Sequence, residues 1–121
     1  MSSILIIDDS VFQRRVVGAP LRAGGFDVYE AVNGNDGLLK IQELQPDLIL
    51  LDILMPEKDG IEVLKELHDL GNTIPVVMLT SDVQESTRNE CLSLGARAFL
   101  NKPVKAEELI PVITALIEKT S

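Results

Sequence analysis

Acidic, hydroxyl and basic side chains follow several short apolar runs in this chain, each at the point where the run ends. Asp8 and Asp9 close the first run, Asp52 and Thr80 close two later ones, and Lys102 follows the last. Three carboxylates in one place repel one another and need a cation. Oxygen donors without His or Cys favour a hard ion, so Mg²⁺ is the first candidate and Mn²⁺ an alternative. A carboxylate nucleophile, a divalent ion, a hydroxyl and an ammonium are the parts that phosphoryl transfer requires, with an acyl phosphate as the product.

Taken singly, these residues have ordinary structural explanations. The pair Asp8-Asp9 could simply open a helix, and Thr80 could cap the helix that follows it. Asp52 could be a loop carboxylate and Lys102 a solvated charge. Their shared position, after the first, third, fourth and fifth apolar runs, is what indicates a common site, because ligands of open α/β sheets bind outside the carboxyl ends of the strands.

Strand-like and helix-like patterns alternate five times along the chain. The apolar runs predict strands at 4–7, 27–31, 48–51, 76–79 and 98–100. The helical spacing predicts a first helix that runs from 11 through 21 and is stopped by Gly24-Gly25, and further helices at 38–44, 61–70, 83–94 and 106–119. Such alternation predicts a parallel sheet with helices on both of its faces. All carboxyl ends of parallel strands then lie on one edge, which would bring the polar side chains together.

Some residues inside the predicted helices conflict with regular helix. Gly18 and Pro20 should kink the first helix or end its regular part early. Pro111 should bend the last helix or delay its start. In the helix at 61–70 every third residue is apolar, so Leu70 is expected on the buried side with the others.

Composition restricts the function further. The 121 residues suit a single domain, expected to span 1–121 without an output domain, and 45% of them are apolar. The net charge of −8 argues against sequence-independent binding to nucleic acid or to anionic membranes. Cys91 is the only cysteine, which suits a reducing compartment, and the first residues have no basic segment typical of a signal peptide. We therefore expect a cytoplasmic protein.

The motifs together resemble the receiver domain of two-component response regulators, the CheY-like family. The resemblance covers essentially the whole chain and rests on the segments Ile6-Ile7-Asp8-Asp9-Ser10, Leu50-Leu51-Asp52-Ile53-Leu54-Met55-Pro56, Asp59-Gly60, Leu79-Thr80-Ser81, Gly95-Ala96 and Phe99-Leu100-Asn101-Lys102-Pro103. It implies a flavodoxin-like (βα)5 three-layer sandwich, with a five-stranded parallel sheet in the order 2-1-3-4-5.

The resemblance also implies a role for each residue of the acidic site. Asp52 would be the phosphoacceptor. Asp8 and Asp9 would bind Mg²⁺ with Asp52, and the backbone carbonyl of Leu54 would be a further ligand. Leu54 and Asp82 occupy positions that tune dephosphorylation in the family. Leu54 cannot hydrogen-bond an attacking water, so we expect a longer phosphoryl lifetime than in relatives that carry an amide there.

A second group of residues would act as the switch. Thr80 would turn its hydroxyl towards the phosphoryl group, Lys102 would pair with carboxylate and then with phosphate, and Phe99 would change rotamer with Thr80. The Lys102-Pro103 peptide bond would be cis. The phosphoryl group would come from a sensor histidine kinase. A downstream protein would then contact the helix at 83–94, the strand at 98–100 and the C-terminal helix.

Other functions fit parts of the pattern. The protein could pass the group to a histidine phosphotransfer domain, or act on a motor or kinase complex as chemotaxis regulators do. A phosphohydrolase with an aspartyl-phosphate intermediate would need a second acid where Leu54 stands. A flavodoxin would need a hydroxyl-rich loop where Asp8-Asp9 would repel phosphate. We therefore expect a signalling switch that catalyses only its own phosphorylation and dephosphorylation, and no enzyme in the usual sense.

Overall fold

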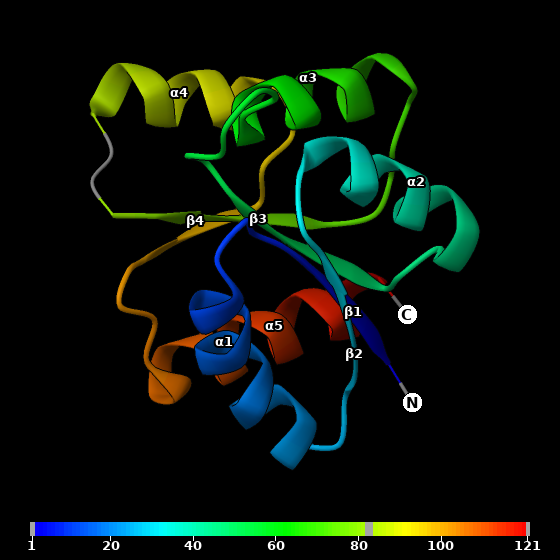
Figure 1. The fold of residues 1–121 in the computed structure, drawn as a ribbon, viewed down its shortest axis with the longest axis vertical. Coiled ribbons are helices and arrows are strands. Elements are labelled where there is room, and N and C mark those ends of the chain that lie inside the picture. The colour runs from blue at the N-terminus through cyan, green and yellow to red at the C-terminus, as the bar shows by residue number, and fades with distance from the viewer. Residues whose placement is uncertain (1, 82–83, 121) are drawn as a thin grey trace.

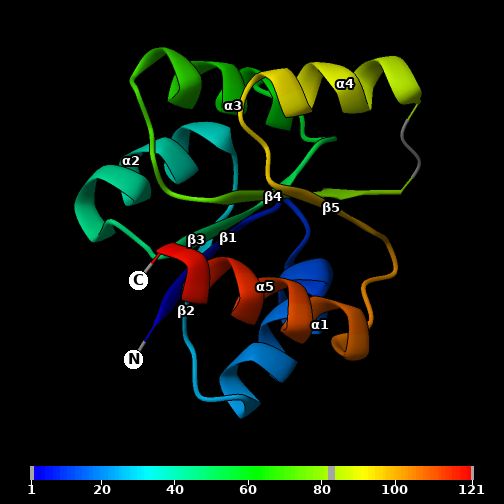
Figure 2. The same cartoon turned by 180° about the vertical axis from the view of Figure 1, so that it is seen from behind.

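The protein is an α/β sandwich of three layers. The computed structural model describes residues 2–81 and 84–120. The elements in chain order are β1 (Ser3–Ile7), α1 (Val11–Ala23), β2 (Asp27–Ala31), α2 (Gly34–Leu44), β3 (Leu48–Asp52), α3 (Gly60–Asp69), β4 (Val76–Thr80), α4 (Glu85–Ser93), β5 (Ala98–Asn101) and α5 (Ala106–Thr120). In Figure 1 the sheet separates α2, α3 and α4 above from α1 and α5 below, and Figure 2 shows the same layers from behind.

The sheet has five parallel strands in the order β2-β1-β3-β4-β5. The predicted fold class and strand order are therefore confirmed. Ile4 pairs with Leu48, and Asp52 pairs with Leu79 across the neighbouring strand. Because all strands run the same way, the chain after β1, β3, β4 and β5 leaves the sheet at one edge, where the predicted site residues lie.

Two apolar clusters hold the layers together, one on each face of the sheet. Alternate strand residues supply them, since successive side chains of a strand point to opposite faces. Leu5, Ile7, Ile49, Leu51 and Met78 pack under α2, α3 and α4, whereas Ile4, Ile6, Leu48, Leu50 and Leu79 pack against α1 and α5. No helix among the described residues combines the length and the apolar character needed to cross a membrane.

Polar caps define where the helices begin. The Ser10 hydroxyl accepts a hydrogen bond from the Gln13 amide and starts α1, as the sequence suggests. In α3 the Asp59 carboxylate accepts from the Glu62 amide, and the Glu62 carboxylate accepts from the Asp59 amide. This reciprocal capping box fixes the loop between Asp52 and α3 at its far end.

The structure decides three expectations about where helices begin and end, and it excludes the early end and the delayed start that were two of the expected outcomes. The helix α1 does not end early, because it continues through Pro20 to Ala23 while Val17 and Leu21 remain packed on the sheet. The start of α5 is not delayed by Pro111. The helix predicted from residue 83 begins as α4 at Glu85, and residue 83 lies outside the described residues.

The apolar side of α3 also differs from the expectation. Leu70 is 71% exposed, whereas Val63 is fully buried in the cluster that covers this face of the sheet. A strict repeat of three drifts around a helix that has 3.6 residues per turn. By residue 70 the repeat has therefore turned away from the core.

Gly60 allows α3 to begin directly beneath the end of β3. Its amide donates to the Ile53 carbonyl at 2.8 Å. A Cβ atom at this position would lie 2.1 Å from the Asp52 carbonyl oxygen and 2.8 Å from the Ile53 Cα. Both are backbone atoms, so a side chain here can be accommodated only by moving the backbone next to Asp52.

We predict that Gly60→Ala lowers the free energy of unfolding by about 3 kcal/mol, the upper end of the usual cost of overpacking. Urea unfolding followed by circular dichroism measures this change. Gly24→Ala is the matched control, because its Cβ would meet no atom closer than 3.4 Å and should cost far less. Equal unfolding midpoints for the two variants would contradict the packing argument.

Candidate functional site

The three predicted carboxylates meet at the carboxyl edge of the sheet. Asp8, Asp9 and Asp52 each offer an oxygen atom within 4.8 Å of the others. Asp8 and Asp52 are buried, with 1% and 4% of their surface exposed, while Asp9 is exposed. The site is therefore a cluster of two buried carboxylates that opens to solvent through a third.

Lys102 is the cation that faces this cluster. Its Nζ lies 2.9 Å from Asp52 Oδ1 and 3.2 Å from Asp8 Oδ2, and its side chain is 14% exposed. The Lys102 amide donates to the Thr80 carbonyl at 2.7 Å, which ties the loop after β5 to the end of β4. The Lys102-Pro103 peptide bond is cis, as the resemblance implies. One ammonium thus bridges the carboxylates at the carboxyl ends of β1 and β3.

Burial and like charges act together on Asp52. Burial raises the pKa of the Asp52 carboxyl above its ordinary value, the charges of Asp8 and Asp9 raise it further, and Lys102 offsets only part of this. Burial by itself would lower the pKa of Lys102. Its hydrogen bond to Asp52 and its attraction to both buried carboxylates outweigh that effect, so the pKa of Lys102 is raised. The ammonium therefore stays charged, while negative charge on Asp52 is costly.

The donor set of this cluster suits a hard divalent cation. Three carboxylates face a single ammonium, so about two negative charges remain without a partner inside the cluster. All available ligands are oxygen atoms, which favours Mg²⁺ or Mn²⁺ over softer metals. Asp8, Asp9 and Asp52 are the residues that could hold the ion.

Asp8 is held at several of its polar atoms, not only by Lys102. Its Oδ1 accepts from the Ser10 amide at 2.9 Å, and its own amide donates to the Ala31 carbonyl at 3.2 Å. The Arg14 guanidinium donates to the Asp8 backbone carbonyl at 2.7 Å. Asp8 is consequently fixed in both backbone and side chain.

Arg14 is a residue that sequence reasoning missed. It lies on α1, is only 8% exposed, and pairs with Glu30 of β2. A signal was present in the sequence, because residues 14, 17 and 21 share one helical face and the other two are the apolar Val17 and Leu21. A charged residue on a buried stripe needs a buried partner.

Thr80 and Phe99 lie on the same face of the sheet. Thr80 is the last residue of β4 and is 3% exposed. Phe99 pairs in register with Met78, two residues before Thr80, and is partly buried in the cluster beneath α3 and α4. The Arg88 guanidinium of α4 lies over the Phe99 ring, 5.0 Å from its centroid. Thr80, Phe99 and α4 are thus neighbours on one face.

The remaining predicted residues are Leu54, Asp82 and Pro103. Leu54, two residues after Asp52, is 73% exposed. Asp82 lies outside the described residues. Pro103 is exposed in the loop between β5 and α5.

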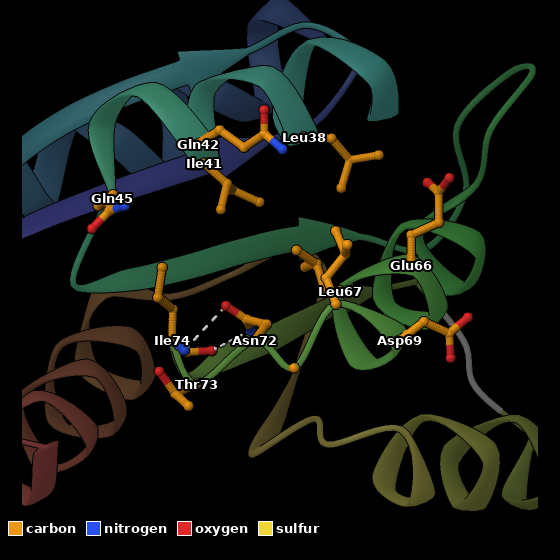
Figure 3. A pocket seen from close by; sticks show the side chains of 12 residues that line it. Leu38, Ile41, Gln42, Gln45, Glu66, Leu67, Asp69, Asn72, Thr73 and Ile74 are labelled. Carbon is orange, nitrogen blue, oxygen red and sulfur yellow. Dashed lines mark hydrogen bonds between the residues drawn. The ribbon is translucent and has the colours of Figure 1, made fainter.

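A larger groove lies away from this cluster. It has a volume of about 720 Å³ and runs between α2 and the loop that leads from α3 to β4. Figure 3 shows Ile41 of α2 facing Leu67 of α3 across the groove, and Asn72 hydrogen-bonded to Ile74, which also line it. Ile74 precedes β4, so the groove lies at the amino edge of the sheet, opposite Asp52. It therefore plays no part in the acidic site.

The fold and the acidic edge together define a doubly wound α/β protein of the CheY-like class. The sequence profile of the response regulator receiver domain matches residues 4–114. The chain therefore belongs to the response regulator receiver domain family. Members of this family are signalling switches controlled by phosphorylation, and not enzymes in the usual sense.

Individual relatives agree with this assignment. The chain is 39% identical over its whole length to a Haemophilus influenzae transcriptional regulatory protein, a CpxR homolog, of which it covers 52%. It is 37% identical to the chemotaxis protein CheY of Bacillus subtilis over 91% of this chain and 92% of that one. The receiver domain of the Francisella response regulator 1452 superimposes with a TM-score of 0.93 at 28% identity, covering each chain completely. The chain thus spans about half of some relatives and nearly all of another.

We predict that Asp52→Asn raises the melting temperature at pH 7 in the absence of divalent ions, by about 4 °C for each kcal/mol gained. The folded pKa of Asp52 lies above its unfolded pKa. Protonation therefore favours folding, and the stability that it confers is present below the unfolded pKa and lost as pH rises through the folded pKa. The advantage of the variant should accordingly shrink as pH falls to about 4.

Thermal unfolding in EDTA over a series of pH values measures this effect. Asp69→Asn, which removes an exposed carboxylate from α3, is the control and should change the melting temperature little. Lys102 keeps its contact with Asp8 in the Asp52 variant, so no cation is left unpaired. A variant less stable than the wild type at pH 7 would show that the folded state does not disfavour the charged form of Asp52.

Proposed function

We propose that this chain is a phosphorylation switch in which Asp52 accepts a phosphoryl group from a sensor histidine kinase. One observation carries the proposal: the Lys102 ammonium bridges Asp52 and Asp8 inside a cluster of three carboxylates. This arrangement offers a carboxylate nucleophile beside a fixed positive charge. The exposed Asp9 leaves the cluster open to a phosphodonor.

The transfer itself needs few groups from the protein. A carboxylate oxygen of Asp52 attacks the phosphorus atom of a phosphohistidine, the new O–P bond forms, and the P–N bond to the imidazole breaks. The leaving imidazole takes a proton from solvent and becomes neutral. The product on this chain is an aspartyl phosphate, a mixed anhydride that water later hydrolyses.

A divalent cation completes the charge balance. Receiver domains bind Mg²⁺ in an acidic pocket, and here Asp8, Asp9 and Asp52 would hold it, with the Leu54 backbone carbonyl as a further ligand. When bound, Mg²⁺ supplies positive charge to the three carboxylates and to the phosphoryl oxygens. Lys102 acts alongside it as the protein's own cation.

Thr80 and Phe99 would carry the signal away from Asp52. Phosphorylation adds about two negative charges and three strong acceptors at one point. The Thr80 hydroxyl, at the end of the strand next to β3, can turn towards these acceptors. Phe99 can then move into the space that Thr80 leaves, because both side chains lie on the same face of the sheet. The surface formed by α4, β5 and α5 changes shape as a result.

The downstream partner would bind this surface. Response regulators are phosphorylated by histidine kinases and act on downstream targets, and the relatives described above include a transcriptional regulator and a chemotaxis protein by name. We propose a protein partner here. Onward transfer to a histidine phosphotransfer domain is the alternative, and it would use the same Asp52 chemistry.

We predict that incubation with acetyl phosphate and Mg²⁺ adds one phosphoryl group to the protein. Asp52 is the expected acceptor because its carboxylate is the one that pairs most closely with Lys102. Intact-mass spectrometry measures the gain, and Asp52→Asn is the variant that should remain unmodified.

Three controls keep this experiment decisive. Omission of Mg²⁺ should reduce labelling of the wild type, and Asp69→Asn should be labelled like the wild type. Modification of the Asp52→Asn variant to the same extent would overturn the assignment of the phosphoacceptor. Continuous release of phosphate over many turnovers would indicate a phosphohydrolase instead.

We predict that Leu54→Asn hastens loss of the phosphoryl group by about 5-fold, the factor that one hydrogen bond of about 1 kcal/mol to an attacking water provides. Leu54 is 73% exposed beside the site, so the amide can reach solvent water. Decay of labelled protein after removal of the donor measures the rate. Leu54→Ala separates hydrogen bonding from mere access, and equal rates for the two variants would contradict the role of the amide.

A further inference from the structure

Arg14 occupies an unusual position behind the acidic site. Four polar or charged residues are buried in the described part of the chain. One is Arg14, and the other three are Asp8, Asp52 and Thr80 of the site itself. A buried guanidinium is costly unless it is paired and hydrogen-bonded. The contacts of Arg14 therefore show which groups offset the cost of its burial.

Arg14 joins the turn after β1 to strand β2. Its Nη1 donates to the Asp8 backbone carbonyl at 2.7 Å, and its Nε donates to Glu30 Oε1 at 2.8 Å. The other Glu30 oxygen accepts from Arg22 Nη2 at 3.0 Å. Glu30 lies on β2 beside Ile6 of β1, so the guanidinium is anchored to the sheet. One donor of the planar guanidinium thus holds the Asp8 carbonyl, while a second donor anchors the same group to Glu30.

The Asp8 carbonyl belongs to the peptide group that leads to Asp9. That group is planar, so holding its oxygen also fixes its N–H and the Cα of Asp9. The Asp9 side chain has no hydrogen bond or ion pair to another described residue. Its place in the carboxylate cluster therefore depends on the backbone that Arg14 holds.

We infer that Arg14, anchored by Glu30, is a positioning residue that sets Asp8 and Asp9 for binding of a divalent cation. This inference rests on the proposed metal site and names a residue that controls it without touching the ion. Partners behind the ligands of a metal commonly change its affinity by about 10- to 100-fold when they are removed.

The sign of the effect separates positioning from simple electrostatics. Removal of the Arg14 charge makes the surroundings of the carboxylates more negative, and Coulomb attraction alone would then strengthen binding of Mg²⁺. Loss of the carbonyl contact frees the Asp8–Asp9 peptide and weakens binding. The two explanations therefore predict opposite changes in affinity.

We predict that Arg14→Met weakens Mg²⁺ binding by about 10-fold or more. Isothermal titration calorimetry of the purified chain with Mg²⁺ measures the dissociation constant, and denaturant unfolding in EDTA measures stability separately. Arg22→Met is the matched control, because it removes the other guanidinium from the same Glu30 carboxylate but has no contact with Asp8. It should leave the dissociation constant within about twofold of the wild type.

The outcomes distinguish this inference from the proposed function. Unchanged or tighter binding by Arg14→Met overturns the positioning role, and so does an equal loss in both variants. If Arg14→Met does not fold, Arg14→Lys is the deciding variant, because an ammonium cannot hold the Asp8 carbonyl and Glu30 together as the planar guanidinium does. Weakened Mg²⁺ binding by Arg14→Lys supports the positioning role, and wild-type affinity overturns it. Absence of Mg²⁺ binding in the wild type overturns the proposed metal site itself, and the role of Arg14 falls with it.

Discussion

The contact of the Lys102 ammonium with two buried carboxylates is the interaction on which the rest of the site depends. Nζ lies within 3.2 Å of both Asp8 and Asp52, which stand at the carboxyl ends of neighbouring central strands. Without this cation the carboxylates would repel one another at a poorly solvated edge. With it, the cluster still carries excess negative charge, which a divalent cation can balance. The negative charge of the resting site is thus only partly balanced, and the site can therefore respond to an added ion or phosphoryl group.

The parallel sheet brings the carboxylates and the ammonium together. The carboxyl ends of β1, β3, β4 and β5 bring Asp8, Asp52, Thr80 and Lys102 to one edge, although they are up to 94 residues apart. Gly60 lets α3 start directly beneath Asp52, and the cis peptide at Pro103 follows the lysine. Lys102 also hydrogen-bonds the Thr80 carbonyl through its amide, so the cation and the proposed switch residue are joined through the backbone.

Much of this could be predicted from the sequence, because the polar residues that end the apolar runs lie at the carboxyl ends of parallel strands, and these ends share one edge of the sheet. The order of the strands and the meeting of Asp8, Asp9 and Asp52 follow from alternation and family resemblance. The expectation for Pro20 and the missed residue Arg14 both depend on packing between elements that are distant in the sequence. Pro20 is tolerated because α1 is held on the sheet by Val17 and Leu21. The role of Arg14 on α1 depends on Glu30, 16 residues away on strand β2, and no local pattern pairs them.

The central claim is that charge placed on Asp52 is transmitted to the surface around Phe99. The most direct measurement is an amide NMR spectrum of the protein with Mg²⁺, recorded before and after addition of beryllofluoride, a phosphoryl mimic. The account predicts that resonances shift at Thr80, along α4, at Phe99 and in α5, and that Asp52→Asn abolishes these shifts. Shifts confined to residues next to Asp52 would contradict the coupling.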